Sequence, residues 1–379
     1  MTGRMDKICV IGIVTIDDYI NYGNRLQNYA LTKLLEAEGL RVINGIRVNT
    51  KQEYVICSPG IIKKLVKILV PYRLIKDRIT LKPIKHSGLL EQREARFLEF
   101  TNQYTSILSP IVAPNHRKAM KIFDRYGIDY FVAGSDQVWN PVFAGIAYEF
   151  LTFAPKNMRL SFAASIGVDS IPNDKVERYR KSLNAMKYLS VREQRAVEII
   201  KELTGRDADL TLDPTLLLEP EKWQQAVKKP DIALEQKYIC TYFLGETPEA
   251  VQAFAQEKGL PIYVLNSGEY PELFTLDPGE FLYMIQQAAY VLTDSFHAVA
   301  FSIKFHKEFY VFDRKEEGMA NMFSRIETIT NRFHLENRIQ RRDAIAEQPP
   351  VEHWETIDRE LLMEKKLSMG RLMKAMGIK

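Results

Sequence analysis

The sequence lacks the short motifs that mark several large enzyme classes. It contains no HExxH, HxxxH or CxxC spacing, so a dedicated metal site has little support. It also contains neither the GxSxG turn of common serine hydrolases nor the GxxxxGKS/T loop of P-loop proteins. These absences argue against a serine hydrolase and against a P-loop nucleotide enzyme.

Long apolar runs are absent as well, and cysteines are few. No run approaches the ~20 apolar residues that a transmembrane helix needs, and the short run near the N-terminus leads straight into a polar loop. We therefore expect neither a signal peptide nor a transmembrane helix. The three cysteines, Cys9, Cys57 and Cys240, lie far apart, which fits reduced thiols in a cytoplasmic protein.

The charge of the chain is nearly balanced. A formal net charge of +4 over 379 residues gives no reason to expect a nucleic-acid partner. The length suits roughly two domains of common size, and a hydrophobic fraction of 46% is ample for buried cores. The composition therefore predicts a globular protein.

One basic amphipathic stretch, 61–85, stands out from this balance. Leu65, Ile68 and Leu69 can share one helical face while lysines line its edges. Such a segment can lie on an anionic membrane surface. It can equally be a surface helix whose apolar face covers the domain core, and the pattern alone leaves both interpretations open.

Strand-like runs followed by helical periods recur along the chain, which predicts an α/β protein with mainly parallel sheets. The first unit is a strand over 8–14 and a helix over about 25–38. The loop between them lacks GxGxxG spacing, so it gives little support to dinucleotide binding. The predicted parts of the chain are an N-terminal α/β domain over 1–215, a C-terminal α/β domain over 216–345 and a helical segment over 346–379.

Polar residues follow several of the predicted strands. In open α/β folds, ligands bind at the edge formed by the carboxyl ends of the strands. Two domains whose edges face one another would therefore place these residues around one cleft. In chain order, the candidates are Asn24 and Gln27; Ser135, Asp136, Trp139 and Asn140; Ser165; Arg192; and Asp294, Ser295 and His297.

The last of these groups lies at a predicted helix start. Ser295 suits the N-cap, which places His297 in the first turn, where free backbone N–H groups and the helix dipole favour an anion. A phosphate or a carboxylate fits there. The alternative is that Asp294 and Ser295 only cap the helix and that His297 only packs.

Other candidates also have two interpretations. Arg192 can hold a carboxylate or phosphate by a bidentate contact, or form a salt bridge at the surface. Asp136 can act as a general base, or accept hydrogen bonds from backbone N–H groups of its turn. Trp139 can stack on a sugar ring, or anchor the packing beside a proline. Arg325, on a predicted helix, can add a second cation.

Seven stretches occur in a characteristic order, and in this order they resemble the polysaccharide pyruvyl transferase family. They span about 21–329, which is most of the chain, and their ordered combination is fairly specific. The stretches are NYGNRLQNYAL, YFVAGSDQVWNP, SFAASIG, LSVREQRAVEIIKELTG, LTLDPTLLL, TDSFHAVAFSIKF and MFSRIETI.

The resemblance implies a transferase that moves the pyruvyl group of phosphoenolpyruvate onto a sugar, usually as a cyclic ketal, and releases phosphate. It also implies two facing Rossmann-like domains, as in GT-B glycosyltransferases. The implied acceptor is a sugar of a capsular, exopolysaccharide or cell-wall polymer, commonly on a lipid carrier at the cytoplasmic membrane face. Peripheral contact with an anionic membrane would give the stretch at 61–85 a purpose. Phosphoenolpyruvate is a co-substrate here, and the chemistry requires neither a cofactor nor a metal.

The resemblance also implies roles for residues. Arg192 and His297 match the arginine after the SVRE strand and the histidine of the strand-to-helix turn. His297 is the natural group to move protons near neutral pH, and Arg192 would help to hold the donor's anionic groups. Some family members have an arginine two residues before this histidine, where this chain has Ser295. Arg325 or the N–H groups of the helix start are candidates for the missing positive charge.

The remaining candidates complete this predicted site. Asp136 would deprotonate the acceptor hydroxyl. The predicted donor-binding residues are Arg192, Asp294, Ser295 and Arg325, and the predicted acceptor or cleft residues are Asn24, Gln27, Ser135, Trp139, Asn140 and Ser165. Two other functions fit the same residues: a GT-B glycosyltransferase that uses a nucleotide sugar, and a non-catalytic carbohydrate-binding or scaffold protein.

Overall fold

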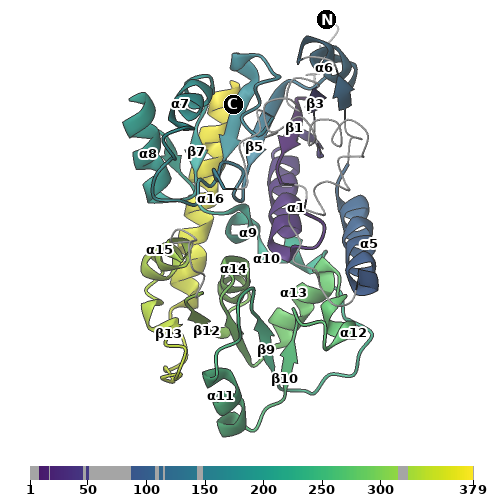
Figure 1. The fold of residues 1–379 in the computed structure, drawn as a ribbon, viewed down its shortest axis with the longest axis vertical. Coiled ribbons are helices and arrows are strands. Elements are labelled where there is room, and N and C mark those ends of the chain that lie inside the picture. Colours follow the sequence, from purple (N-terminus) through teal and green to yellow (C-terminus); the bar gives the residue numbers. More distant parts are fainter. Residues whose placement is uncertain are drawn as a thin grey trace, which may run out of the picture.

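The computed structural model of the protein contains two large parallel sheets, which lie one above the other in Figure 1. It describes residues 8–16, 18–45, 48–50, 87–106, 111–113, 116–142, 148–314 and 323–378. The basic stretch at 61–85 and Cys57 lie outside the described residues, so the membrane contact stays a prediction. Within the described ranges, no helix is both long and apolar enough to cross a membrane.

The first sheet comes from the N-terminal half of the chain. Its parallel strands run in the order β2 (Arg41–Ile43), β1 (Val10–Val14), β5 (Tyr130–Gly134) and β6 (Arg159–Phe162). Parallel bridges extend it toward β7 (Ser190–Val191), which pairs with β8 (Asp209–Leu210). β1 is apolar and fully buried, as expected for a strand with both faces covered. A separate parallel pair joins β3 (Val48–Thr50) and β4 (Ile111–Ala113).

The helices of this half follow its strands in the predicted alternation. The helix that the sequence predicts to begin near residue 25 begins at Tyr22, because Asn21 is its N-cap and accepts a hydrogen bond from the N–H of Asn24. The helices of this half are α1 (Tyr22–Ala37), α5 (Ser87–Tyr104), α6 (His116–Phe123), α7 (Val176–Asn184) and α8 (Gln194–Thr204).

The second sheet has five parallel strands. Their order is β10 (Ile262–Val264), β9 (Ile239–Tyr242), β11 (Tyr290–Thr293), β12 (Glu308–Phe312) and β13 (Ile339–Gln340). Its helices are α11 (Ala250–Lys258), α12 (Pro271–Phe274), α13 (Pro278–Gln287), α14 (Phe296–Lys304) and α15 (Ser324–Arg332). A capping box of Asp277 and Glu280 starts α13 and satisfies free N–H groups of its first turn.

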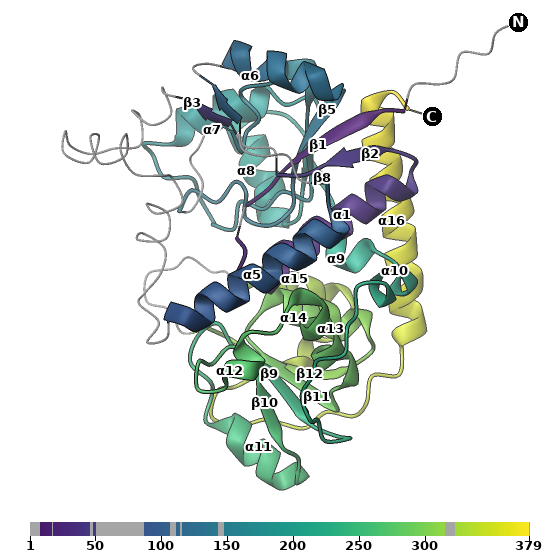
Figure 2. The ribbon, with the colours of Figure 1, turned by 90° about the vertical axis from the view of Figure 1, so that its right-hand side faces the viewer.

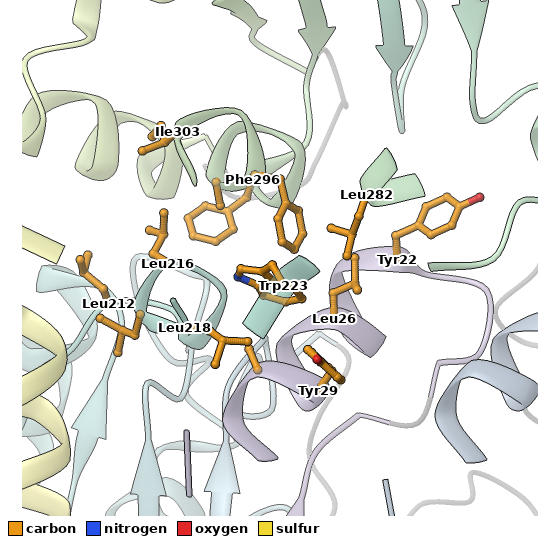
Figure 3. Close-up of a cluster of buried hydrophobic side chains, with 14 of the residues drawn as sticks. Tyr22, Leu26, Tyr29, Leu212, Leu216, Leu218, Trp223, Leu282, Phe296 and Ile303 are labelled. Atoms are coloured by element: carbon orange, nitrogen blue, oxygen red, sulfur yellow. The ribbon is translucent and has the colours of Figure 1, made fainter. Parts of the chain in front are cut away.

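The two halves share one hydrophobic core where they meet. Figure 3 shows this cluster, with Trp223 at its centre. The ring of Trp223 lies 5.3 Å from that of Tyr29 in α1 and 5.0 Å from that of Phe301 in α14. Trp223 belongs to α10 (Pro220–Gln224), which follows α9 (Pro214–Leu217) in the connecting segment. Because large apolar side chains of both halves are buried together, the two sheets are held in a fixed relation.

Two further helices link the halves. Arg93 of α5 donates hydrogen bonds to the carbonyls of Ile20 and Phe274, which belong to different halves. The C-terminal helix α16 (Trp354–Met376) runs back from the second sheet to the first, as Figure 2 shows. At its end the hydroxyl of Tyr130 donates to the carbonyl of Met376 at 2.7 Å. The predicted C-terminal helix is therefore confirmed.

The carboxyl edges of the two sheets face each other. Asp213 follows β8 of the first half and His297 follows β11 of the second, and Nε2 of His297 lies 3.9 Å from Oδ2 of Asp213. The predicted fold class is confirmed: an α/β protein with two facing Rossmann-like domains and a C-terminal helix. The loops after the strands of both sheets consequently meet in one place.

Candidate functional site

Arg192, directly after β7, lies at the centre of these facing edges. Its side chain is 3% exposed, and Nη1 lies 2.5 Å from Asp213, Nε 3.3 Å from Glu193 and Nη2 3.8 Å from Asp136. Burial by itself would lower the pKa of Arg192, but these three carboxylates raise it above its ordinary value. Arg192 is therefore buried and charged, and it is not a surface salt bridge.

Asp213 holds Arg192 in place, and sequence reasoning did not single it out. It is the N-cap of α9, where Oδ1 accepts from the N–H and the hydroxyl of Thr215. Its Oδ2 accepts from the hydroxyl of Ser135 at 2.8 Å. Burial would raise the pKa of Asp213, but Arg192 and His297 lower it to about 2. An aspartate before a proline at a helix start was the signal that could have revealed it.

His297 lies in the first turn of α14, as predicted, and is 8% exposed. Burial lowers the pKa of its imidazole below the ordinary value, and the opposing effect of Asp213 and Asp136 does not compensate. The ring is therefore mostly neutral at pH 7. Nε2 of His297 and Nη2 of Arg192 are both buried without a hydrogen-bond partner among the described residues.

Asp136 adds a second carboxylate to the same cluster. It follows β5 in a left-handed backbone conformation with φ of 59°, and its Oδ2 accepts a hydrogen bond from the side-chain amide of Asn24 at 3.0 Å. Burial would raise its pKa, but His297 and Arg192 lower it below its ordinary value. Asp136 is thus an ionised acceptor, and its side chain is 14% exposed.

Asp294 lies in the turn between β11 and α14, as predicted. Its carboxylate accepts from the backbone N–H groups of Leu244 and Gly245 at 2.7 and 2.9 Å, and from Nε of Arg314 at 3.1 Å. The side chain has no exposed surface, and its hydrogen bonds join the loops after β9, β11 and β12. Its predicted donor-binding role stays a prediction. Ser295 occupies the predicted N-cap, although its side chain makes no capping hydrogen bond.

Arg325 of α15 reaches the same helix start. Its Cζ lies 5.8 Å from the centre of the Phe296 ring, and that of Arg192 lies 4.8 Å from the same ring. Burial and the nearby Arg192 lower the pKa of Arg325 to about 10, so it remains charged at neutral pH. Two arginines from different halves of the protein therefore flank the first residue of α14.

A sequence model of the polysaccharide pyruvyl transferase family matches residues 21–316, which include every charged residue described above except Arg325. The chain belongs to the polysaccharide pyruvyl transferase family. It is thereby a transferase of polysaccharide biosynthesis, and the predicted family is confirmed. None of the curated proteins compared with it matches its sequence.

Solved structures similar to this family member have low sequence identity to it. A UDP-GlcNAc 2-epimerase from Neisseria meningitidis, bound to UDP-GlcNAc, is 9% identical, with 97% of this chain and 100% of that chain covered at a TM-score of 0.46. A glycosyltransferase from Rickettsia africae is 11% identical, with 98% of each chain covered at a TM-score of 0.43.

The other predicted residues of this family member divide into two groups. Asn24, Ser135 and Ser165 contact the charged cluster, because they donate hydrogen bonds to Asp136, Asp213 and Glu193 respectively. Gln27 lies beneath them, fully buried, and donates to Thr15 and to the carbonyl of Asn24.

The side chains of Trp139 and Asn140 make their hydrogen bonds to groups outside the charged cluster. The ring of Trp139 has no exposed surface, stacks on Phe150 and donates to the carbonyl of Glu149. Trp139 therefore anchors the packing, which was the second of its two interpretations, because no face of the ring is left for a sugar. Asn140 is 2% exposed and donates to the side-chain carbonyl of Gln137. Among the described residues, no group of three or more His, Cys, Asp and Glu side chains could hold a metal ion.

Gly23 allows α1 to approach His297. A Cβ at this position would lie 2.0 Å from Nδ1 of His297, closer than any side chain allows. We expect Gly23→Ala to displace the imidazole and to lower transferase activity by ~10²-fold, since a misplacement of about 1 Å can cost that much. The activity of the purified variant measures this.

Gly88→Ala is the matched control, because among the described residues no atom outside the backbone of α5 itself lies within 4 Å of a Cβ at that position. Alanine also has the higher helix propensity. This control is expected to keep full activity and an unchanged or slightly higher melting temperature. Full activity in Gly23→Ala would show that the close approach of α1 to His297 has no functional role.

Proposed function

We propose that the protein transfers the pyruvyl group of phosphoenolpyruvate onto a sugar of a cell-surface polysaccharide or of its lipid-linked precursor, forming a pyruvate ketal and releasing phosphate. The observation that carries this proposal is a pair of buried atoms, Nη2 of Arg192 and Nε2 of His297, that make no hydrogen bond among the described residues. Buried polar atoms without hydrogen bonds cost free energy, and an anionic ligand between the two sheets would satisfy both.

The ketal forms in steps that these residues can assist. The methylene carbon of the donor takes a proton, and the oxygen of the first sugar hydroxyl bonds to the adjacent carbon. The bond from that carbon to the phosphate oxygen then breaks, and the oxygen of a second hydroxyl takes its place. Each of the two sugar hydroxyls loses one proton. One of these protons returns to the group that protonated the methylene carbon, and the other leaves with the phosphate. Proton transfer by positioned groups near neutral pH is the main requirement.

His297 is the group that gives the methylene carbon its proton. It is neutral in the free protein because burial lowers its pKa. The negative charge of a bound donor would stabilise the protonated imidazole of His297. Donor binding would therefore favour the form of His297 that can give up a proton. Asp136 is ionised and partly exposed, which suits it to accept the proton of the attacking hydroxyl.

A lipid-linked acceptor and peripheral contact with an anionic cytoplasmic membrane belong to the same proposal. They rest on the basic residues of 61–85 and on the family to which the chain belongs. Changing Lys63, Lys64 and Lys67 to glutamate would weaken binding to vesicles that contain anionic lipid. If this variant and the parent protein bound the vesicles equally well, the proposed contact with the membrane would be wrong.

The direct test is an assay of acceptor-dependent phosphate release. The protein is incubated with phosphoenolpyruvate and either a galactose- or an N-acetylmannosamine-type acceptor, with UDP-GlcNAc as the competing donor. We expect phosphate release that requires the acceptor, together with a ketal detectable by mass spectrometry. Transfer from UDP-GlcNAc without any use of phosphoenolpyruvate would contradict the proposal and favour a glycosyltransferase.

A further inference from the structure

The outer face of α16 carries a cluster of exposed apolar side chains. Eight large apolar residues are exposed in the described part of the chain, and three of them lie close together on this helix. They are Leu362, Met363 and Leu367, with exposed fractions of 47%, 62% and 49%. The helix forms one edge of the molecule in the view of Figure 2. Scattered exposed apolar residues are ordinary, whereas a contiguous cluster is typical of an interaction surface.

This cluster is not the face by which α16 packs on the rest of the chain. Met363, Leu367 and Gly370 have the i, i+4, i+7 spacing of one helical face, and all three are exposed. Among the described residues, no atom outside the helix lies within 4 Å of a Cβ at Gly370. The packing face is a different one, and its buried apolar residues are Ile357, Leu361, Met369, Leu372, Met373 and Met376. The helix therefore has a second apolar face that the described chain leaves uncovered.

The charges of α16 are divided between its two ends. Residues 355–360 contain three acids and one arginine, whereas residues 364–374 contain four basic residues and one glutamate. Glu355, Lys366 and Lys374 are exposed, and none of them forms an ion pair in the described structure. The apolar cluster lies at the junction between the negative and the positive end.

An antiparallel second copy of α16 complements this surface. Across a twofold axis, the negative end of each helix faces the positive end of the other, and the two apolar clusters meet at the centre. The opposed helix dipoles act in the same direction as these charges. A parallel copy would bring like charges together, and an anionic membrane would repel the acidic end.

We infer that the protein forms a twofold-symmetric homodimer in which the outer faces of two antiparallel α16 helices pack on each other. Leu362, Met363 and Leu367 form the centre of the contact. The 23 residues of α16 span ~35 Å, so a single helix pair is small beside the ~1,200–2,000 Å² of a stable interface. We therefore expect a reversible dimer with a dissociation constant on the order of micromolar. The inference does not depend on the proposed function.

Sedimentation velocity at ~1–100 μM protein, around the expected dissociation constant, measures the dimer. Met363→Glu places one new negative charge from each copy at the centre of the contact. It is expected to raise the dissociation constant at least ~10-fold, since like charges would face each other there. Val142→Glu is the matched control, because Val142 is 67% exposed and lies far from α16 in the sequence. This control is expected to change the dissociation constant less than ~2-fold.

Exchange of charges tests the antiparallel arrangement. The variant with Glu355→Lys and Glu360→Lys has two positive ends, and the variant with Lys366→Glu and Lys374→Glu has two negative ends. Each variant alone is expected to dimerise at least ~10-fold more weakly than the parent. An equimolar mixture is expected to recover dimers, because each positive end then faces a negative one. Damage to the fold would not be repaired by mixing, and circular dichroism checks the fold of every variant.

Each result decides the inference. A parent protein that stays monomeric at ~100 μM, well above the expected dissociation constant, would show that the cluster does not bind a second copy, even if it binds vesicles that contain anionic lipid. A dimer that Met363→Glu leaves intact would place the contact on another surface. If the two charge variants did not pair with each other, the antiparallel arrangement would be wrong.

Discussion

Replacement of His297 by glutamine is expected to lower the rate of acceptor-dependent phosphate release by ~10²–10⁴-fold, the usual contribution of a general acid or base. Glutamine keeps a polar side chain in the first turn of α14 but cannot supply a proton. The imidazole lies 3.9 Å from the Asp213 carboxylate, and burial keeps it mostly neutral in the free protein. The measurement is kcat with saturating phosphoenolpyruvate.

His306→Asn is the matched control for this variant. His306 follows the same helix, but it pairs with Asp358 and stacks on Trp354. Its backbone has a φ of 53°, a conformation that asparagine tolerates. This control is expected to keep at least half of the parent rate. If His297→Gln also kept half of that rate, His297 would not be the proton donor.

The role of His297 as an acid also predicts how kcat/KM changes with pH. Burial lowers the pKa of His297 below 6.5, so only a minor fraction of the free protein carries the acid form at pH 7. If that form protonates the donor, kcat/KM rises as the pH falls from about 8 to 6. A phosphate group also titrates at about pH 6, so the profile of His297→Gln shows how much the donor contributes. Parallel profiles in parent and variant would contradict the role of His297.

Asp213→Asn is expected to have the largest effect on both stability and activity. Asparagine keeps the shape of the side chain but removes the charge that lies 2.5 Å from Nη1 of Arg192. Breaking a buried ion pair in this way costs ~3–5 kcal/mol in the free energy of unfolding. Because Asp213 also contacts Ser135 and lies beside His297, phosphate release should fall by at least ~10²-fold.

Urea unfolding at several pH values measures this loss. The pKa of Asp213 is about 2 in the folded protein and ordinarily 3.8, so its contribution to stability is present above about pH 4 and disappears as the pH falls toward 2. The difference between parent and variant should shrink over that range. Asp207→Asn is the control, because Asp207 is 92% exposed and pairs only with Lys201 in the described structure. Equal stability of Asp213→Asn and the parent would contradict the buried network.

The sequence predicted the fold well because its signals are local. Alternating strand and helix patterns and the capping box at Asp277 each need only a few neighbouring residues. The first helix was predicted to begin near residue 25, whereas α1 begins at Tyr22. This error also has a local cause. Gly23 in its first turn has a low helix propensity, yet the structure needs glycine there because His297 lies against it.

The site was predicted only in part because its residues meet through tertiary structure. Arg192, Asp136 and His297 could be found, since each follows a strand and has a side chain suited to chemistry. The role of Asp213 in orienting Arg192 could not, because its contacts join residues far apart in the chain.

Trp139 shows the opposite error. It lies in the loop after β5 with Asp136, but the chain turns after Asp136 and carries the indole into the core. Sequence position places both residues near the sheet edge. Only the backbone conformation decides which side chain faces the other domain.

The central claim is that the facing carboxyl edges of the two sheets hold phosphoenolpyruvate beside His297. A crystal structure with phosphoenolpyruvate bound tests it most directly. We expect donor density at the start of α14, with Nε2 of His297 and the guanidinium of Arg325 within about 4 Å of the donor. Density for the donor anywhere else on the protein, with His297 making no contact to it, would contradict the account.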